Sequence, residues 1–210
     1  MRDCIAGTYP MPPLNDPAIR LRLIPYLKAS DPKLWLREEM GINKCIADLV
    51  TVSDTELHVY EIKSDVDKVG RLRDRVKRGR YGRTYTRKGQ VTAYSAMADK
   101  VTLVVGEVLL LESLELIPDW WGVLVARKDG SLKVHREGGQ NPDLRWVNVV
   151  KFLWRAEALA VCEKLGVARG VRGASKAQLK KRLKQHLSLE DLRSHVRETL
   201  RARTWDKYLR

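Results

Sequence analysis

The chain has 210 residues, of which 44% are hydrophobic, which is enough for one substantial core and a small additional unit. It carries 40 basic and 26 acidic residues, and the net charge of +14 favours a polyanionic partner such as nucleic acid. No apolar run is long enough to cross a membrane and no secretory signal is evident, so we expect a cytoplasmic protein with no membrane partner.

Two helices are expected at the start of the chain. The first covers residues 16–27, begins with an N-cap and a proline, and presents Ile19, Leu21, Leu23 and Ile24 for packing on a sheet. The second covers residues 32–40 and stops at Gly41.

The next stretch predicts a β-hairpin that forms a site. Two apolar runs, residues 47–52 and 57–63, flank the short polar turn 53–56. Strand alternation projects Glu61 and Lys63 from one face while Ile62 enters the core, and pairing across the hairpin can bring Asp48 alongside Glu61. Two adjacent carboxylates repel unless a cation lies between them, and oxygen ligands suit Mg²⁺ or Mn²⁺. A lysine beside that metal can orient water or neutralise charge on a phosphate.

This arrangement resembles the hallmark of the PD-(D/E)xK nuclease superfamily, an aspartate followed by a strand that ends in Glu-x-Lys on the adjacent hairpin arm. The matching residues are Asp48, Glu61 and Lys63. The alternative is two ordinary half-exposed strands with solvated ends, because such a motif arises often by chance in a chain that is 31% charged.

Further features are similar to the RecB-like and phage-exonuclease branch, whose small members occur in bacteria and phages. Glu39 matches a glutamate on the helix before the aspartate strand, with Glu38 as a competitor for that role. Gln90 and Tyr94 match a Gln-x-x-x-Tyr element, on an expected helix over residues 89–100. A buried strand over residues 101–106, then residues 117–125 and a closing strand over 130–135, complete the resemblance, which covers roughly residues 30–137.

The resemblance implies an α/β fold with a restriction-endonuclease-like core, a central mixed β-sheet flanked by helices, and a small C-terminal helical extension. It implies a metal-dependent DNA nuclease in repair, recombination or phage DNA processing, located in the bacterial cell or phage-infected host. Asp48, Glu61, the Ile62 carbonyl and Glu39 would hold Mg²⁺ or Mn²⁺, and Lys63 would position the attacking water. Gln90 and Tyr94 would orient Lys63 or hold phosphate. No base-reading helix is evident, so we expect recognition of DNA structure rather than sequence.

A strongly basic segment, residues 71–88, lies between the Glu-x-Lys strand and Gln90, and half of its residues are basic. We expect a basic loop or helical arm beside the site, whose arginines hold phosphates and whose tyrosines stack on unpaired bases. The alternative is a solvated loop. The candidate DNA-binding residues are Arg71, Arg73, Arg75, Arg78, Arg80, Tyr81, Arg83, Tyr85, Arg87 and Lys88.

The C-terminal part predicts a separate basic unit. A helix is expected to end near residue 165, so that residues 1–165 form the nuclease-like domain, and three glycines in 166–173 suggest a linker. Capping signals at Ser175 and Ser188 begin two helices, so residues 166–210 form a helical hairpin. It faintly resembles the SAP DNA-binding module, through a segment that contains Lys180, Lys181 and Arg182.

Two alternatives stay open at this point. A non-catalytic DNA-binding or recombination-accessory protein would keep the fold and use only its basic surfaces, although it has no need for clustered carboxylates. RNA remains an alternative substrate, because nothing in the motif reads the 2′-hydroxyl. The sequence does not distinguish end-directed from internal cleavage and does not indicate the oligomeric state.

Overall fold

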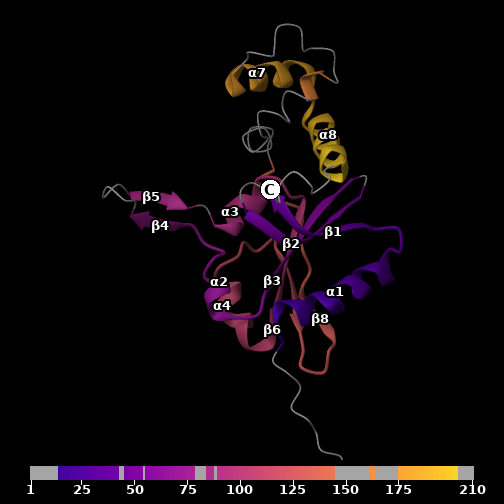
Figure 1. Cartoon of the computed structure of the whole chain (residues 1–210), viewed down its shortest axis with the longest axis vertical. Coiled ribbons are helices and arrows are strands. Elements are labelled where there is room, and N and C mark those ends of the chain that lie inside the picture. The colour runs from indigo at the N-terminus through magenta and orange to yellow at the C-terminus, as the bar shows by residue number, and fades with distance from the viewer. Residues whose placement is uncertain are drawn as a thin grey trace, which may run out of the picture.

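A computed structural model describes residues 14–42, 45–53, 55–78, 84–87, 89–144, 161–163 and 175–202. Figure 1 shows the elements in space. In chain order they are α1 (Asp16–Ser30), β1 (Trp35–Ile42), β2 (Cys45–Val52), β3 (Leu57–Lys63), α2 (Val66–Val69), β4 (Arg75–Arg78), β5 (Thr84–Arg87), α3 (Gln90–Ser95), β6 (Lys100–Gly106), η1 (Glu107–Leu109), α4 (Leu110–Leu114), β7 (Gly122–Ala126), β8 (Leu132–Arg136), α7 (Lys176–His186) and α8 (Leu189–Ala202).

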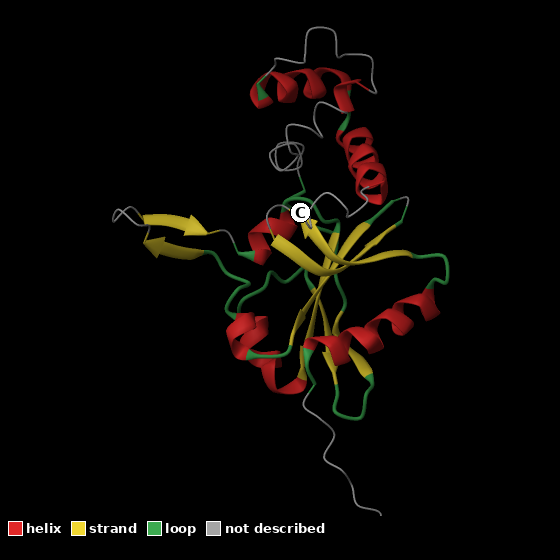
Figure 2. Cartoon of the chain, viewed as in Figure 1, coloured by secondary structure: helices red, strands yellow, loops and turns green. Residues whose placement is uncertain are grey.

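The centre of the molecule is a six-stranded sheet in the order β1-β2-β3-β6-β7-β8. β1, β2 and β3 form an antiparallel meander, β3, β6 and β7 run parallel, and β8 closes the sheet antiparallel to β7. The prediction of an α/β fold with a central mixed sheet flanked by helices is therefore confirmed. Figure 2 shows the helices on either side of this sheet.

Helix α1 covers one face of the sheet. Asn15 caps it by accepting a hydrogen bond from the Ala18 backbone at 2.9 Å. Ile19, Leu23 and Leu27, spaced four residues apart, are buried and form a cluster with residues of β2, β3, β6 and β7 that include Ile62. The predicted helix is confirmed, but Leu21 is wrongly placed in its apolar surface, because it is 75% exposed.

The opposite face of the sheet packs on α2, α3, η1 and the C-terminal helices. The cluster on this face joins Val59 of β3 and Val101 and Leu103 of β6 to Tyr94 of α3. The predicted strands over residues 101–106 and 130–135 are confirmed as β6 and β8. Helix α3 ends at Ser95, earlier than expected, and Lys100 already belongs to β6.

The expected second helix, over residues 32–40, is wrong. Residues 35–42 form β1, which pairs with β2 from Trp35↔Val52 to Ile42↔Cys45, with Glu39 left out of the register. Pairing with the neighbouring strand outweighs the local helical preference of this segment. Gly41, expected as a helix stop, lies inside the strand with nothing within 4 Å of the position of a Cβ.

The segment predicted as a basic loop or helical arm contains a two-stranded ribbon instead. β4 and β5 pair antiparallel as a sheet of their own, from Arg75↔Arg87 to Arg78↔Thr84. Figure 1 shows this ribbon projecting from the body of the molecule next to α3. The structure thus corrects the backbone conformation expected for the part of the segment that it describes.

The two capped helices predicted for the C-terminal part of the chain are confirmed. Ser175 and Gln178 form a capping box at α7, and Ser188 and Asp191 bond reciprocally at the start of α8. Leu179, Leu183, Leu192 and Val196 are buried in the same cluster as the strands of the sheet. The helix expected before residue 165 is described only at residues 161–163, and the expected linker over 166–173 lies outside the described residues. The domain boundary stays a prediction.

Within the described part of the chain, no helix is both long enough and apolar enough to span a membrane.

Candidate functional site

The hairpin of β2 and β3 brings Asp48 next to the Glu-x-Lys strand, at the point where the two strands separate. Their ladder ends at the pair Leu49↔Tyr60. Beyond that pair, the Asp48 Oδ2 atom accepts the backbone N–H of Ile62 at 2.7 Å, so a side chain takes the place of a ladder acceptor. Asp48 is therefore held at the fork between the strands, with 21% of its side chain exposed.

Glu61 is the centre of a buried polar network. Its Oε1 atom accepts hydrogen bonds from Lys63 Nζ and from Gln90 Nε2, and its Oε2 atom accepts the Tyr94 hydroxyl proton at 2.7 Å. The Tyr94 hydroxyl also lies 2.9 Å from the Ile46 carbonyl oxygen. Because Gln90 and Tyr94 are one turn apart on α3, one helix face supplies both donors, as the Gln-x-x-x-Tyr spacing indicates.

Strand alternation places these groups as the sequence predicts. Ile62 lies in the cluster beneath α1, whereas Glu61 and Lys63 face α3 on the other side of the sheet. Lys63 Nζ also donates to the Ile62 carbonyl at 3.2 Å. The lysine thus joins the carboxylate and the carbonyl that were predicted to be metal ligands.

Burial dominates the electrostatics of the site. The side chains of Glu61 and Lys63 are only 1% and 4% exposed. Burial raises the pKa of the Glu61 carboxyl to about 7, and the Asp48 charge acts in the same direction, whereas Lys63 and Tyr94 oppose the shift. Burial, together with the Glu61 charge, also raises the pKa of Tyr94 well above its usual value, so that its hydroxyl remains a donor.

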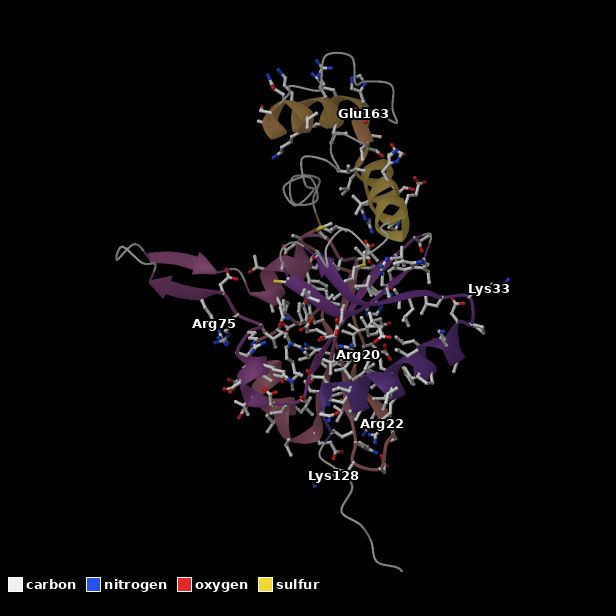
Figure 3. All side chains as sticks on the ribbon, viewed as in Figure 1. Arg20, Arg22, Lys33, Arg75, Lys128 and Glu163 are labelled. Carbon is white, nitrogen blue, oxygen red and sulfur yellow. The ribbon has the colours of Figure 1, made fainter. Side chains whose placement is uncertain are left out.

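Arg20 of α1 is a site residue that the sequence did not single out. Its NH2 atom lies 3.6 Å from Asp48 Oδ1, and its NH1 atom lies 3.3 Å from Glu38 and 3.2 Å from Glu39. Burial acts to lower the pKa of Arg20, but the hydrogen bond to Glu39 and the three carboxylate charges raise it overall. Figure 3 shows Arg20 at the centre of the molecule.

A second ion pair, between Lys68 and Asp16, lies one helical turn before Arg20 on α1. Lys68 of α2 donates to Asp16 Oδ2 at 2.7 Å and to Ser64, the residue after Lys63, at 3.3 Å. Asp16 is four residues before Arg20 and so shares its helix face. The four-residue spacing of Asp16 and Arg20 is visible in the sequence, but no local sequence pattern indicates that this face of α1 packs against the β2–β3 hairpin.

Glu39 differs from its expected placement on a helix. It lies on β1, has a positive φ of 49°, is 66% exposed and pairs with Arg20. Among the described residues, no three side chains of the His, Cys, Asp and Glu types are close enough to hold a metal ion together. The structure therefore brings together Asp48, Glu61, Lys63, Gln90 and Tyr94, and adds Arg20, while Glu39 reaches Asp48 only through that arginine.

The predicted DNA-binding residues fall in three places. Arg71 and Arg73 are exposed on the chain leading to the ribbon, and Arg75, Arg78, Tyr85 and Arg87 belong to β4 and β5. Lys180, Lys181 and Arg182 lie on α7, where Lys181 is exposed. Arg80, Tyr81, Arg83 and Lys88 lie outside the described residues.

A family model described as bacteriophage P4 protein cII matches residues 13–210. The chain belongs to this family. The match supports the predicted phage origin and does not extend to a nuclease family. No curated protein and no solved structure matches the chain.

Proposed function

We propose that this phage protein is a divalent-metal-dependent nuclease that hydrolyses phosphodiester bonds in DNA. One observation carries the proposal: adjacent strands bring Asp48 beside the Glu61 and Lys63 pair, and α3 adds two donors to the same carboxylate. An acid at a strand fork, a second acid and a lysine are the three residues of the PD-(D/E)xK pattern.

The chemistry of these donors fits Mg²⁺ or Mn²⁺. Asp48 and Glu61 supply carboxylate oxygens, and the third oxygen would come from the carbonyl of Ile62, the residue whose N–H binds Asp48. The cationic groups of Lys63 and Arg20 now contact these acids, so the cluster already attracts positive charge. A bound metal would lower the pKa of its water and stabilise charge on the scissile phosphate.

The residues around the metal ligands have distinct roles in this proposal. Lys63, released from Glu61, would hold the attacking water or take its proton. Tyr94 and Gln90 keep the Glu61 carboxylate in one orientation, because they bond its two oxygens from a fixed helix. Arg20 would contact the phosphate once Asp48 binds metal, since a guanidinium matches phosphate oxygens in charge and geometry.

The substrate proposed is DNA in repair, recombination or phage DNA processing, read by structure rather than by sequence. The net charge of +14 supports a polyanionic substrate, and the basic segment joins the two elements of the site. Glu39 would be a fourth ligand of the metal if its ion pair with Arg20 breaks.

The test is cleavage of end-labelled single-stranded, duplex, flapped and four-way-junction DNA, and of RNA, with Mg²⁺, Mn²⁺ or EDTA. We expect the wild type to cut DNA only with metal, and Lys63→Met to lose at least about 100-fold in rate while still binding DNA. Lys100→Met is the matched control, because Lys100 pairs with Glu56 at the other end of the parallel strands and should leave cleavage unchanged.

The burial of the site supports a second candidate function, a DNA-binding accessory protein without catalysis. Glu61 and Lys63 are nearly inaccessible and satisfy each other, which is also what a purely structural ion pair would do. Binding to DNA without cutting of any substrate under any metal condition would favour this function and contradict the nuclease proposal.

A further inference from the structure

The ribbon of β4 and β5 is fixed to the same helix that carries Gln90 and Tyr94. The chain entering the ribbon bonds to the chain leaving it: Gln90 N donates to Arg71 O at 3.3 Å and Val91 N donates to Leu72 O at 3.1 Å. The backbone of Gln90 is thus bound to the ribbon stem while its side chain bonds Glu61. The ribbon therefore has a defined place relative to the candidate site.

Asp74 acts as a clamp at the ribbon base. Its Oδ1 atom accepts Gly89 N at 2.7 Å and Thr92 Oγ1 at 2.8 Å. Arg75, labelled beside the ribbon in Figure 3, donates to Gly70 O at 3.0 Å. The segment from 71 to 88 contains one acidic residue, and its carboxylate bonds to both Gly89 and Thr92 at the base of the ribbon.

The register gives the two faces of the ribbon different compositions. Positions 75 and 87 are paired, as are positions 77 and 85, and alternation puts these two pairs on one face. That face holds Arg75, Lys77, Tyr85 and Arg87. The other face holds Val76, Arg78, Thr84 and Thr86, with a single basic residue.

The dimensions of the ribbon suit one kind of nucleic acid. Four residue pairs span about 10 Å along the strands, and the two strands are about 5 Å apart. The major groove of B-form DNA, about 12 Å wide and 8.5 Å deep, accepts a two-stranded β-ribbon. The major groove of an A-form RNA helix is too narrow to be read in this way.

We infer that the β4–β5 ribbon enters the major groove of duplex DNA, with the face of Arg75, Lys77, Tyr85 and Arg87 toward the DNA. This inference rests on the proposed nuclease function, and it specifies the substrate of that nuclease: DNA that is double-stranded next to the bond that is cleaved. The positive charge of this face complements the negative phosphates along the edges of the groove. The clamp at Asp74 would keep the bound duplex at a fixed distance from Glu61.

The test is binding measured by fluorescence anisotropy in EDTA, so that its outcome does not depend on cleavage. The probes are a 20-base-pair DNA duplex, its single strand and an RNA duplex of the same sequence. Lys77→Glu changes the proposed DNA face, and Lys128→Glu is the matched control, because it makes the same charge change at an exposed position in the turn between β7 and β8, away from the ribbon (Figure 3).

We expect the wild type to bind the DNA duplex at least about 10-fold more tightly than the other two probes. Lys77→Glu should weaken duplex binding about 10-fold and reduce its salt dependence, whereas Lys128→Glu should change it less than about 3-fold. Equal weakening by both variants, or equal affinity of the wild type for all three probes, would overturn the inference. Either result leaves the cleavage test of the proposed function to be decided separately.

Discussion

Glu61 shows how a single buried residue determines the identities of its neighbours. A carboxylate that is 1% exposed is costly to bury unless donors surround it, and three side chains from β3 and α3 donate to its two oxygens. Lys63, Gln90 and Tyr94 supply these donors. The Asp48 charge is near enough to raise the pKa of this carboxyl further.

The Tyr94 hydroxyl can be tested through stability. Tyr94→Phe removes the donor to Glu61 and leaves the Ile46 carbonyl without that contact, so we expect a loss of about 2 kcal/mol in the free energy of unfolding by urea. Tyr26→Phe is the control, because Tyr26 is 42% exposed and should change stability by less than about 0.5 kcal/mol. Equal effects of the two changes would contradict this role of Tyr94.

Glu56 gives a pH-dependent prediction away from the site. Hydrogen bonding to His58, aided by Lys100 at 2.8 Å, lowers the pKa of Glu56 to about 2. A lowered carboxyl pKa stabilises the fold above the usual value of about 4.5, and that contribution is lost as the pH falls from about 4.5 toward 2.

We therefore expect Glu56→Gln to lower the free energy of unfolding by about 1 kcal/mol at pH 7, after screening by solvent is allowed for, and by less at pH 3. Urea titrations at the two pH values measure the difference. Glu107→Gln, an exposed glutamate near Arg127, is the control and should show little effect at either pH. A destabilisation by Glu56→Gln that grows toward low pH would show that the sign is wrong.

At the residue scale, the sequence predicted the contacts that depend on local periodicity. Asp48, Glu61 and Lys63 come together because a short turn and strand alternation leave little choice of register. Arg20 was missed because its role depends on how α1 crosses the sheet, which no local pattern encodes.

At the scale of elements, long-range pairing explains where the predictions fail. Residues 35–42 have a plausible helical pattern, yet pairing with β2 provides a ladder of backbone bonds from Trp35↔Val52 to Ile42↔Cys45, and the strand forms. The basic segment has no apolar periodicity that would indicate a strand. Its ribbon instead depends on contacts between distant residues, such as the Asp74–Gly89 bond at its base, which the composition does not reveal. The helix starts at Asn15 and Ser175, by contrast, depend on local capping bonds and are predictable.

The ribbon base yields a prediction about glycine. A Cβ on Gly89 would meet Leu72 O and the Arg73 carbonyl carbon at 2.3 Å, and these are backbone atoms that have little freedom to move. Gly89→Ala should therefore destabilise the protein by more than about 2 kcal/mol, measured by urea unfolding. Gly106 also precedes a helical turn but has nothing within 4 Å, so Gly106→Ala should be nearly neutral. A neutral Gly89→Ala would argue against the clamp.

At the scale of the whole molecule, helix α8 is tied to the sheet by buried charges. Arg193 pairs with Asp99, which also accepts the Leu57 backbone N–H at 2.7 Å. Arg197, 5% exposed, donates to the Thr55 carbonyl at 3.1 Å and to Glu190 at 2.8 Å. These contacts join α8 to the β2–β3 turn and to the start of β6, at the end of the parallel strands away from Lys63.

We expect Arg197→Met to loosen this attachment, because it removes the donor to the Thr55 carbonyl and leaves Glu190 with Arg193 alone. Hydrogen exchange of the α8 amides should show a fall of about 2 kcal/mol in the opening free energy, while the amides of β6 stay protected. Lys181→Met, on the exposed side of α7, is the control. Unchanged protection in Arg197→Met would contradict a role for Arg197 in holding α8 to the sheet.

The central claim is that the acids at the strand fork hold a divalent metal, and calorimetric titration with Mn²⁺ tests it most directly. We predict one saturable Mn²⁺ site in the wild type, lost in Asp48→Asn and retained in Asp119→Asn, whose carboxylate is fully exposed on the loop before β7. No Mn²⁺ binding by a folded wild type, or equal binding by Asp48→Asn, would contradict the account.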